Sequence, residues 1–195
     1  LMRPITKASI SVSDTNRIPE LMTLALREAY SGRPGPVFIE IPMDVLDAVV
    51  EQEQVEFPAN IRSMGRQYPD PALIQEAAEL LDRAERPVIL AGGQVWHCRA
   101  EKELAAFVET NGIPAYLNGA ARGCLSGKCS FFLIRSRRHA LSRADAVMII
   151  GTPMDFRLAY GKRIAENAKI IQIDLDYSEL GHNRDIHTGI QGDAK

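Results

Sequence analysis

The sequence lacks the features of a membrane protein and of a nucleic-acid-binding protein. No apolar run approaches the roughly 20 residues that a helix needs to cross a bilayer, and no basic-then-apolar leader opens the 195-residue chain. Lys and Arg number 23 against 25 Asp and Glu, and the resulting net charge of -2 leaves no positive excess for binding nucleic acid. We therefore expect a cytoplasmic protein with no nucleic-acid or membrane partner.

Cysteine is also scarce. Cys98, Cys124 and Cys129 form an odd set without C-x-x-C spacing, which argues against a disulfide framework. A zinc site is not indicated, because the adjacent His97 and Cys98 would diverge on a strand or a helix. The three residues are therefore predicted to be free thiols in a reducing cytoplasm.

What is present is the composition of a soluble globular domain, with 46% hydrophobic and 25% charged residues. The length allows one domain of ordinary size and a smaller piece. The first residues, Leu-Met-Arg-Pro, and the last, Gly-Asp-Ala-Lys, are interpreted as internal cuts in a longer polypeptide.

The chain changes character twice. Residues 1–46 contain a predicted helix at 18–29 and a predicted short strand at 36–41, too few elements for a domain of their own. Residues 47–69 are rich in Glu, Gln and Pro without a clean period and are predicted to be a linker between domains. Residues 70–195 are predicted to be the main domain.

The main domain is predicted to be α/β, with a doubly wound, Rossmann-like parallel sheet and helices on both faces. Its strands are expected at 87–91, 113–117, 146–150 and 170–174, and each is apolar throughout, as strands covered on both faces are. Asp70 and Pro71 mark the start of a helix that runs to residue 84. Further helices are expected at 100–109, 131–143 and 162–167.

Glycines and polar residues follow all four predicted strands, where the carboxyl ends of a parallel sheet form a ligand crevice. Glycine lets the backbone approach a phosphate, a carboxylate can bind ribose hydroxyls, and Arg157 can neutralise a pyrophosphate. Each feature alone also fits a tight turn, a helix cap or a surface salt bridge, but together they predict a nucleotide site. Its residues are Gly92, Gly93, Asn118, Gly151, Asp155, Arg157 and Asp174.

A basic run interleaved with apolar residues follows the second strand. It consists of Arg135, Arg137, Arg138 and Arg143. One interpretation is the solvent-facing side of an amphipathic helix. The other is contact with the phosphates of a nucleotide or of a coenzyme A tail. The sequence contains no P-loop and no supportable catalytic triad.

Several stretches resemble thiamine-diphosphate enzymes. Arg-Pro-Ile-Thr-Lys at 3–7 and Ser-Gly-Arg-Pro-Gly-Pro-Val at 31–37 resemble the end of the family's pyrimidine-binding domain. Arg-Pro-Val-Ile-Leu-Ala-Gly-Gly at 86–93 and Ile-Gln-Ile-Asp-Leu-Asp at 171–176 are similar to its central domain. The similarity runs nearly end to end and is greatest to large subunits of the acetolactate synthase type.

The resemblance implies an enzyme that decarboxylates a 2-keto acid and transfers the carbanion to a second carbonyl, with thiamine diphosphate and magnesium bound by the full-length protein. In such enzymes the central domain holds FAD, or ADP in the oxalyl-CoA branch, and in some relatives it binds nothing. Matching motifs imply the following FAD or ADP contacts: Arg3, Gly92, Gly93, Leu117, Asn118, Gly151, Asp155, Arg157, Asp174, Leu175 and Asp193.

Two departures from the family pattern favour an alternative. Acetolactate synthases carry Gly-Met-His-Gly about where this chain has residues 134–137, and Arg-Phe-Asp-Asp-Arg where it has residues 153–157. Both differences weaken the FAD assignment and point toward a 2-hydroxyacyl-CoA or oxalyl-CoA lyase, or toward an acetolactate synthase-like protein of undefined reaction. A stand-alone nucleotide-binding module is a further alternative, although such a module has no reason to carry residues 31–42.

The resemblance also implies what the segment cannot do alone. The family's catalytic glutamate is expected before Leu1, and its motif for magnesium and diphosphate after Lys195. We therefore expect the segment to be inactive by itself, with no catalytic or metal-binding residue of its own. Its expected partners are the nucleotide, the remaining domains of the same chain and, at full length, further copies in a homo-oligomer.

Overall fold

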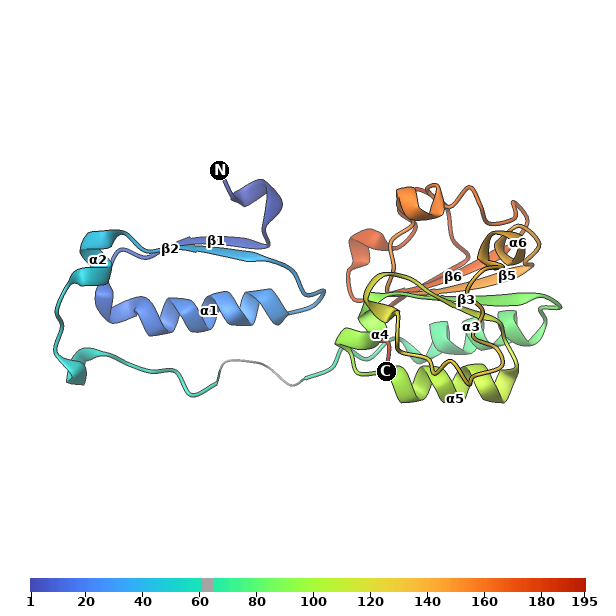
Figure 1. Cartoon of the computed structure of the whole chain (residues 1–195), viewed down its shortest axis with the longest axis horizontal. Helices are drawn as coiled ribbons and strands as arrows, with labels where there is room; N and C mark the ends of the chain where they lie inside the picture. The colour runs from blue at the N-terminus through green and yellow to red at the C-terminus, as the bar shows by residue number, and fades with distance from the viewer. Residues whose placement is uncertain (61–64) are drawn as a thin grey trace. The chain divides into compact units, whose positions relative to one another are not determined.

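The computed structural model describes residues 1–60 and 65–195. The chain forms two compact units, Leu1–Gly65 and Arg66–Lys195, which Figure 1 colours blue to cyan and green to red. The boundary between them lies inside residues 47–69, the range that the composition predicts to be a linker.

The first unit is built on one β-α-β crossover. Strands β1 (Ala8–Ser11) and β2 (Val37–Glu40) pair in parallel, and helix α1 (Ile18–Tyr30) connects them. Helix α2 (Met43–Asp47) and short 3-10 helices at Arg3–Ile5, Thr15–Arg17 and Gln52–Gln54 complete the unit. Strand β1 was not predicted, because its four residues include only one large apolar side chain, that of Ile10.

This unit buries little of its surface. Among its described residues only Val12, Thr23 and Ala25 are buried, while Leu24 and Leu26 on α1 remain exposed. The sequence predicts such exposed apolar surface for a piece too small to form its own core, and the burial confirms it.

The second unit contains five parallel strands. In chain order they are β3 (Pro87–Ala91), β4 (Ala115–Leu117), β5 (Ala146–Ile150), β6 (Lys169–Asp174) and β7 (Thr188–Gln191). Their order across the sheet is β4-β3-β5-β6-β7. The chain builds outward from β3 to β4, then returns to the other side of β3 with β5. The switch point of the sheet therefore lies between the ends of β3 and β5.

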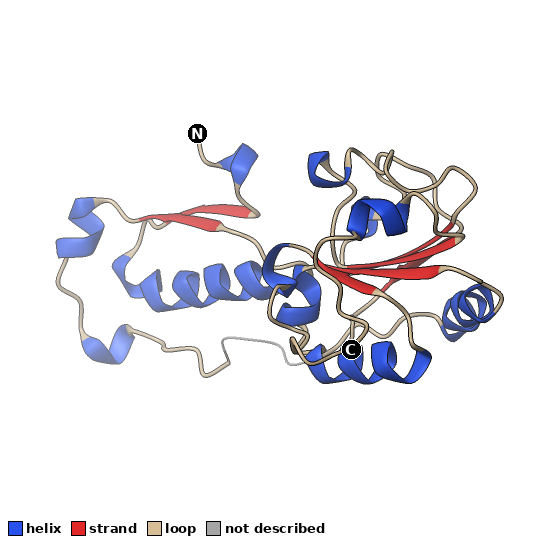
Figure 2. Ribbon diagram, turned by 45° about the vertical axis from the view of Figure 1, so that its right-hand side comes forward, coloured by secondary structure: helices blue, strands red, loops and turns tan. Residues whose placement is uncertain are grey.

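Both faces of this sheet are covered, which confirms the predicted doubly wound fold (Figure 2). Ile89 and Ala91 of β3 face a core closed by α3 (Pro71–Asp82), α4 (Gly93–His97) and α5 (Glu101–Asn111). Val88 and Leu90 face the opposite core, where α6 (Arg137–Leu141) and the irregular chain after β5 pack. Alternate residues of the same strand thus serve two separate cores.

The ends of two helices follow local rules read from the sequence. The Asp70 carboxylate accepts a hydrogen bond of 2.8 Å from the Ala72 N–H, with Pro71 in the first turn of α3. Gly112 ends α5 in the left-handed conformation with φ +63°, which glycine adopts without steric cost. The predicted helix start at Asp70 and Pro71 is thus confirmed.

The helix predicted over residues 131–143 is wrong for its first half, since α6 covers only Arg137–Leu141. Residues 131–136 instead run beside the edge strand β4. Ala115 N–H donates to Phe131 O at 2.8 Å, and Leu133 N–H donates to Ala115 O at 3.1 Å. Consecutive aromatic and branched side chains favour this extended pairing over a helix.

The helix predicted at 162–167 is also wrong, because this segment forms successive turns. Arg184 explains how the turns are stabilised: its guanidinium donates to Gly161 O and Ile164 O, both at 2.7 Å, and to Ala165 O at 2.6 Å. A distant side chain thus satisfies the carbonyls that helix formation would have paired. Strand β7 was not predicted either, because Thr-Gly-Ile-Gln has only one large apolar residue.

Candidate functional site

The predicted strand ends meet at the switch point of the sheet. Gly92 N–H donates to Ile150 O at 2.7 Å, and Asn118 N–H donates to Ala91 O at 2.8 Å. The residues that follow β3, β4 and β5 therefore lie side by side, Gly151 among them. We call this group the strand-end cluster. It comprises Gly92, Gln94, Asn118, Gly151, Thr152 and Asp174.

The two central glycines of this cluster face each other's loops. A Cβ on Gly92 would lie 2.3 Å from both Gly151 O and Thr152 Cβ. A Cβ on Gly151, which has φ +57°, would lie 2.2 Å from Gln94 Cβ. Both positions require glycine because the loops after β3 and β5 pack in direct contact. The space beside these two Cα atoms is filled by the protein itself, so no ligand approaches there.

Gly93 differs from its neighbour. A Cβ at this position would lie 3.5 Å from Ala120 Cβ, which is ordinary van der Waals contact. Gly93 is half-buried and begins α4. Among the predicted glycines, it is the one whose backbone is not closed off by such a tight contact.

Gln94 ties the buried carboxylate of Asp174 into the cluster. Its amide Nε2 donates to Asp174 Oδ1, and its Oε1 accepts a 3.1 Å hydrogen bond from Leu175 N–H. Asp176 N–H also donates to Asp174 Oδ1, at 2.9 Å. Asp174 is only 1% exposed. In this structure it therefore fastens the end of β6 to α4, and a ribose could reach it only by displacing these groups.

Polar groups also connect the ends of β4 and β5. Asn118 Nδ2 donates to Thr152 Oγ1 at 3.1 Å, and both side chains are buried. Sequence reasoning selected Asn118 as a contact but not Thr152 or Gln94, although both follow predicted strands directly after a glycine. Their roles depend on partners far away in the chain, since Thr152 and Asn118 are 34 residues apart.

Arg157 and Asp155 form an ion pair at the rim of the cluster. Arg157 Nη2 lies 2.5 Å from Asp155 Oδ2, and the Arg157 N–H donates to Asp155 Oδ1 at 2.9 Å. The hydrogen bond to Asp155 raises the pKa of Arg157 further above its ordinary value. Arg157 Nη1 lies 3.9 Å from where a Cβ of Gly119 would be. The guanidinium therefore extends from the loop after β5 to the end of β4, with 42% of its side chain exposed.

The remaining predicted contacts lie in different places. Leu117 is buried at the end of β4, and Leu175 is half-buried after β6. Asp193 is half-buried beyond β7, where its carboxylate accepts a 2.8 Å hydrogen bond from Lys195 N–H. Arg3 is exposed and belongs to the first unit, outside the unit that contains the cluster.

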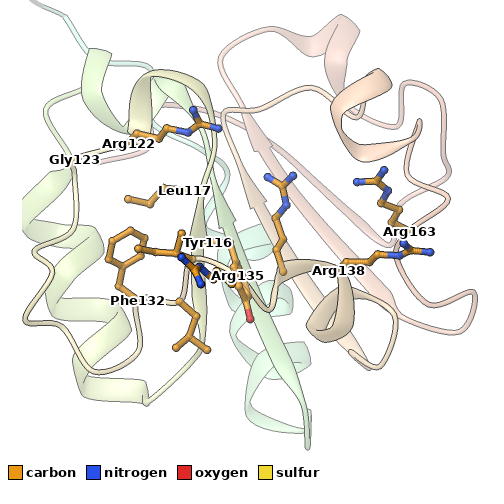
Figure 3. Close-up of a pocket in the computed structure, with 11 residues that line it drawn as sticks. Tyr116, Leu117, Arg122, Gly123, Phe132, Arg135, Arg138 and Arg163 are labelled. Carbon is orange, nitrogen blue, oxygen red and sulfur yellow. The ribbon is translucent and has the colours of Figure 1, made fainter.

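A cavity of about 500 Å³ adjoins the cluster at the end of β4, because Leu117 lines it and precedes Asn118. We call it the arginine cavity, because Arg122, Arg135, Arg137, Arg138 and Arg163 line it. Figure 3 shows Arg122 with Leu117 and Phe132 on one side, and Arg138 and Arg163 on the other. Three of these arginines belong to the predicted basic run. Arg143 is not among the lining residues.

The charges of the arginine cavity are not compensated. Within residues 1–60 and 65–195, none of its five guanidinium groups has an ion pair or a hydrogen bond, and no carboxylate lines the cavity. Arginines elsewhere do have partners, as in the pairs Arg17–Glu20 at 2.8 Å and Arg83–Glu79 at 3.3 Å. Arg122 and Arg163 were missed by sequence reasoning, because only the fold brings them beside the basic run.

Other features have a different chemistry. A second cavity, of about 600 Å³, lies between α3 and α5, is mainly apolar and contains the carboxylates of Asp82 and Glu103, so it does not suit an anion. The described part of the chain places no three His, Cys, Asp or Glu side chains together as metal ligands. Nor do these residues include a helix with the length and apolar character that crossing a membrane requires.

Comparison with known proteins identifies relatives of the whole chain. Residues 74–195 match the family model described as thiamine pyrophosphate enzyme, central domain. A probable acetolactate synthase large subunit of Methanococcus aeolicus is 34% identical over 206 residues, covering 100% of this chain and 34% of the relative. The human 2-hydroxyacyl-CoA lyase 2 is 32% identical over 232 residues, covering 100% of this chain and 37% of the relative.

A solved structure supports the fold. Benzoylformate decarboxylase from Polynucleobacter necessarius superposes with a TM-score of 0.77 over 97% of this chain and 36% of that protein, at 20% identity. The chain spans about a third of the length of the curated relatives it matches.

Proposed function

The chain belongs to the thiamine pyrophosphate enzyme family, and we propose that it is the central-domain part of an acetolactate synthase-like carboligase. In this proposal the domain holds an adenine nucleotide, FAD or ADP, at the carboxyl ends of its strands. The relatives of known name are a synthase, a lyase and a decarboxylase, which supports a thiamine-dependent enzyme for the full-length protein.

One observation carries the nucleotide assignment: the loops after β3, β4 and β5 meet at the switch point of a doubly wound sheet. Such sheets bind their ligands in the crevice at this place. The accessible groups there are the half-buried Gly93 and the exposed Gly119 and Arg157. An approachable backbone beside a guanidinium suits a pyrophosphate, which needs close hydrogen-bond donors and positive charge.

The residues at the strand ends fit this ligand, but not all of them in the way that the sequence implied. Gly93 and Arg157 are accessible and would contact the nucleotide directly. Gly92, Gly151 and Asp174 are engaged by neighbouring protein groups, so we assign them to building the floor beneath it. The cluster thus positions a nucleotide by its shape and by Arg157, while thiamine diphosphate in the full-length enzyme supplies the carbanion chemistry.

A second candidate function is a 2-hydroxyacyl-CoA or oxalyl-CoA lyase. The arginine cavity favours it, because a coenzyme A ester carries phosphate groups and a free 2-keto acid does not. The departures from the acetolactate synthase pattern at residues 134–137 and 153–157 favour it as well. A stand-alone nucleotide-binding module has less support, because the whole chain aligns with these longer enzymes.

Calorimetric titration of the 195-residue chain with FAD and with ADP tests the proposal. We expect saturable binding of at least one of them, weakened about tenfold by Arg157→Gln, because a charge-assisted hydrogen bond contributes about 1.5 kcal/mol or more. Arg83→Gln is the matched control, since Arg83 also pairs with a carboxylate but lies on α3 outside the cluster. If neither FAD nor ADP binds, the nucleotide assignment is refuted.

The catalytic role belongs, in this proposal, to the complete enzyme. We expect no 2-keto acid decarboxylation by the isolated chain, even with thiamine diphosphate and magnesium added, and full activity only with the remaining domains in a homo-oligomer. Release of carbon dioxide by the purified chain would contradict this division of labour.

A further inference from the structure

The arginine cavity concentrates positive charges that no ion pair among the described residues neutralises. Among the residues that the structure describes, five arginines and no carboxylate line about 500 Å³ of space. Placing like charges close together does not stabilise a folded protein, because water screens their mutual repulsion only in part. An anionic ligand would convert this repulsion into charge-assisted hydrogen bonds.

The backbone that carries several of these arginines is fixed in place. Residues 131–133 pair with Ala115 of β4, and Tyr116 Oη lies 2.8 Å from Ser136 Oγ. Arg137 and Arg138 begin α6, whose Leu141 is buried in the core of that face. The arginines therefore extend from anchored main chain, and less order has to be imposed when a ligand binds.

The lining also limits the chemistry of the ligand. Phe132, Leu133 and Ile134 line the cavity together with Tyr116 and Leu117, so apolar side chains are available to a ring of the ligand beside the charge. The cavity volume is within the range of small-molecule sites. Guanidinium groups bind phosphate oxygens in bidentate fashion, and a terminal phosphate group, bonded through only one of its oxygens, carries about -1.5 to -2 charges near neutral pH. A phosphate bonded through two of its oxygens carries only one.

We propose that the arginine cavity binds a terminal phosphate group of an adenine nucleotide, so that this domain prefers a nucleotide with such a group to FAD, whose two phosphates are each bonded through two oxygens, one in an ester and one in the shared anhydride. The inference rests on the proposed function, in that the nucleotide also contacts the adjoining strand-end cluster. Two sources share this chemistry: the terminal phosphate of ADP and the 3′-phosphate of coenzyme A.

Four probes separate these sources in calorimetric titrations of the 195-residue chain in phosphate-free buffer. They are ADP, FAD, coenzyme A and dephospho-coenzyme A, which lacks only the 3′-phosphate. We expect ADP or coenzyme A to bind at least about tenfold more tightly than FAD. Tighter binding of coenzyme A than of dephospho-coenzyme A identifies the 3′-phosphate as the bound group, whereas a preference for ADP alone identifies its terminal phosphate.

The double variant Arg135→Gln/Arg138→Gln tests the site itself. Both side chains are exposed, so the fold should be retained, and the nucleotide with the terminal phosphate should lose about tenfold to a hundredfold in affinity. The affinity of the parent chain should also fall as salt is raised. Arg17→Gln is the control, because Arg17 is paired with Glu20 and belongs to the first unit.

The failures of the two proposals look different. If FAD binds as tightly as ADP and coenzyme A, and the double variant leaves all affinities unchanged, the cavity inference is refuted while nucleotide binding stands. If no probe binds, the proposed nucleotide binding is refuted, and so is this inference.

Discussion

Replacing Gly92 with alanine tests the packing at the switch point. The added methyl group would lie 2.3 Å from Gly151 O and from Thr152 Cβ, more than about 1 Å inside normal carbon contact. Gly92 has φ -116°, a conformation that alanine adopts freely, so the whole cost is steric. Because one of the clashing atoms is main chain, we expect the upper range of overpacking, about 3 kcal/mol.

Thermal denaturation followed by circular dichroism measures this cost. For a domain of this size, about 3 kcal/mol corresponds to a fall in Tm of roughly 10 °C. Gly93→Ala is the matched control one residue away. Its methyl group would lie 3.5 Å from Ala120 Cβ, and its stability should stay within about 0.5 kcal/mol of the parent.

The pair of variants separates two explanations of the glycines. If Gly92 serves close packing, Gly92→Ala loses stability whether or not a nucleotide is present. If the glycine exists to admit a ligand, the variant keeps the parent Tm and loses only binding. An unchanged Tm for Gly92→Ala would therefore refute the packing argument.

Three further predictions concern single side chains. Gln94→Ala should lower the free energy of unfolding by about 3 kcal/mol in urea titrations, because it strips hydrogen bonds from the buried carboxylate of Asp174; a loss below about 1 kcal/mol would show that water replaces the amide. Asp145 accepts hydrogen bonds from Glu85 N–H at 2.8 Å and Arg86 N–H at 2.9 Å. Although burial opposes them, these backbone bonds lower the pKa of Asp145. Since its folded pKa is depressed, the carboxylate stabilises the protein at neutral pH, and this contribution is lost as the pH falls below about 4. Asp145→Asn should thus cost about 1 kcal/mol at pH 7 and progressively less in acid, and a pH-independent difference would contradict this assignment. Burial raises the pKa of the Cys98 thiol to about 11, so its alkylation by iodoacetamide should be slow at pH 8 and accelerate toward pH 11; rapid labelling at pH 7 would contradict it.

The sheet of the second unit could be predicted because most of its strands have a clear local sequence pattern. Val88 to Ala91 and Val147 to Ile150 are continuous apolar runs, and only strands buried on both faces require them. The start of α3 at Asp70-Pro71 and the end of α5 at Gly112 were predictable for the same reason, since each depends on one or two neighbouring residues.

Elements that depend on distant partners were not predictable. Residues 131–133 pair with the exposed edge of β4, and the turns after Tyr160 are held by Arg184, so neither outcome is encoded in the local pattern. Strand β7 has a weak sequence signal and forms because β6 offers it a parallel partner.

The candidate site divides in the same way. That the strand ends would lie together follows from sheet topology alone, and Gly92, Asn118 and Gly151 do lie there. What each residue does there depends on its neighbours. The glycines allow the adjacent loops to pack in direct contact, and the carboxylate of Asp174 accepts a hydrogen bond from Gln94. Arg122 and Arg163 join the basic run only in the folded chain.

The most direct test of nucleotide binding is a crystal structure of this chain grown with a saturating concentration of ADP or coenzyme A, whichever binds more tightly. The account predicts the adenine nucleotide over Gly93 and Arg157 at the switch point, with the terminal phosphate of ADP or the 3′-phosphate of coenzyme A hydrogen-bonded to guanidinium groups of the arginine cavity. Density for the nucleotide in the apolar cavity between α3 and α5, or a strand-end cluster that stays free of nucleotide, would contradict it.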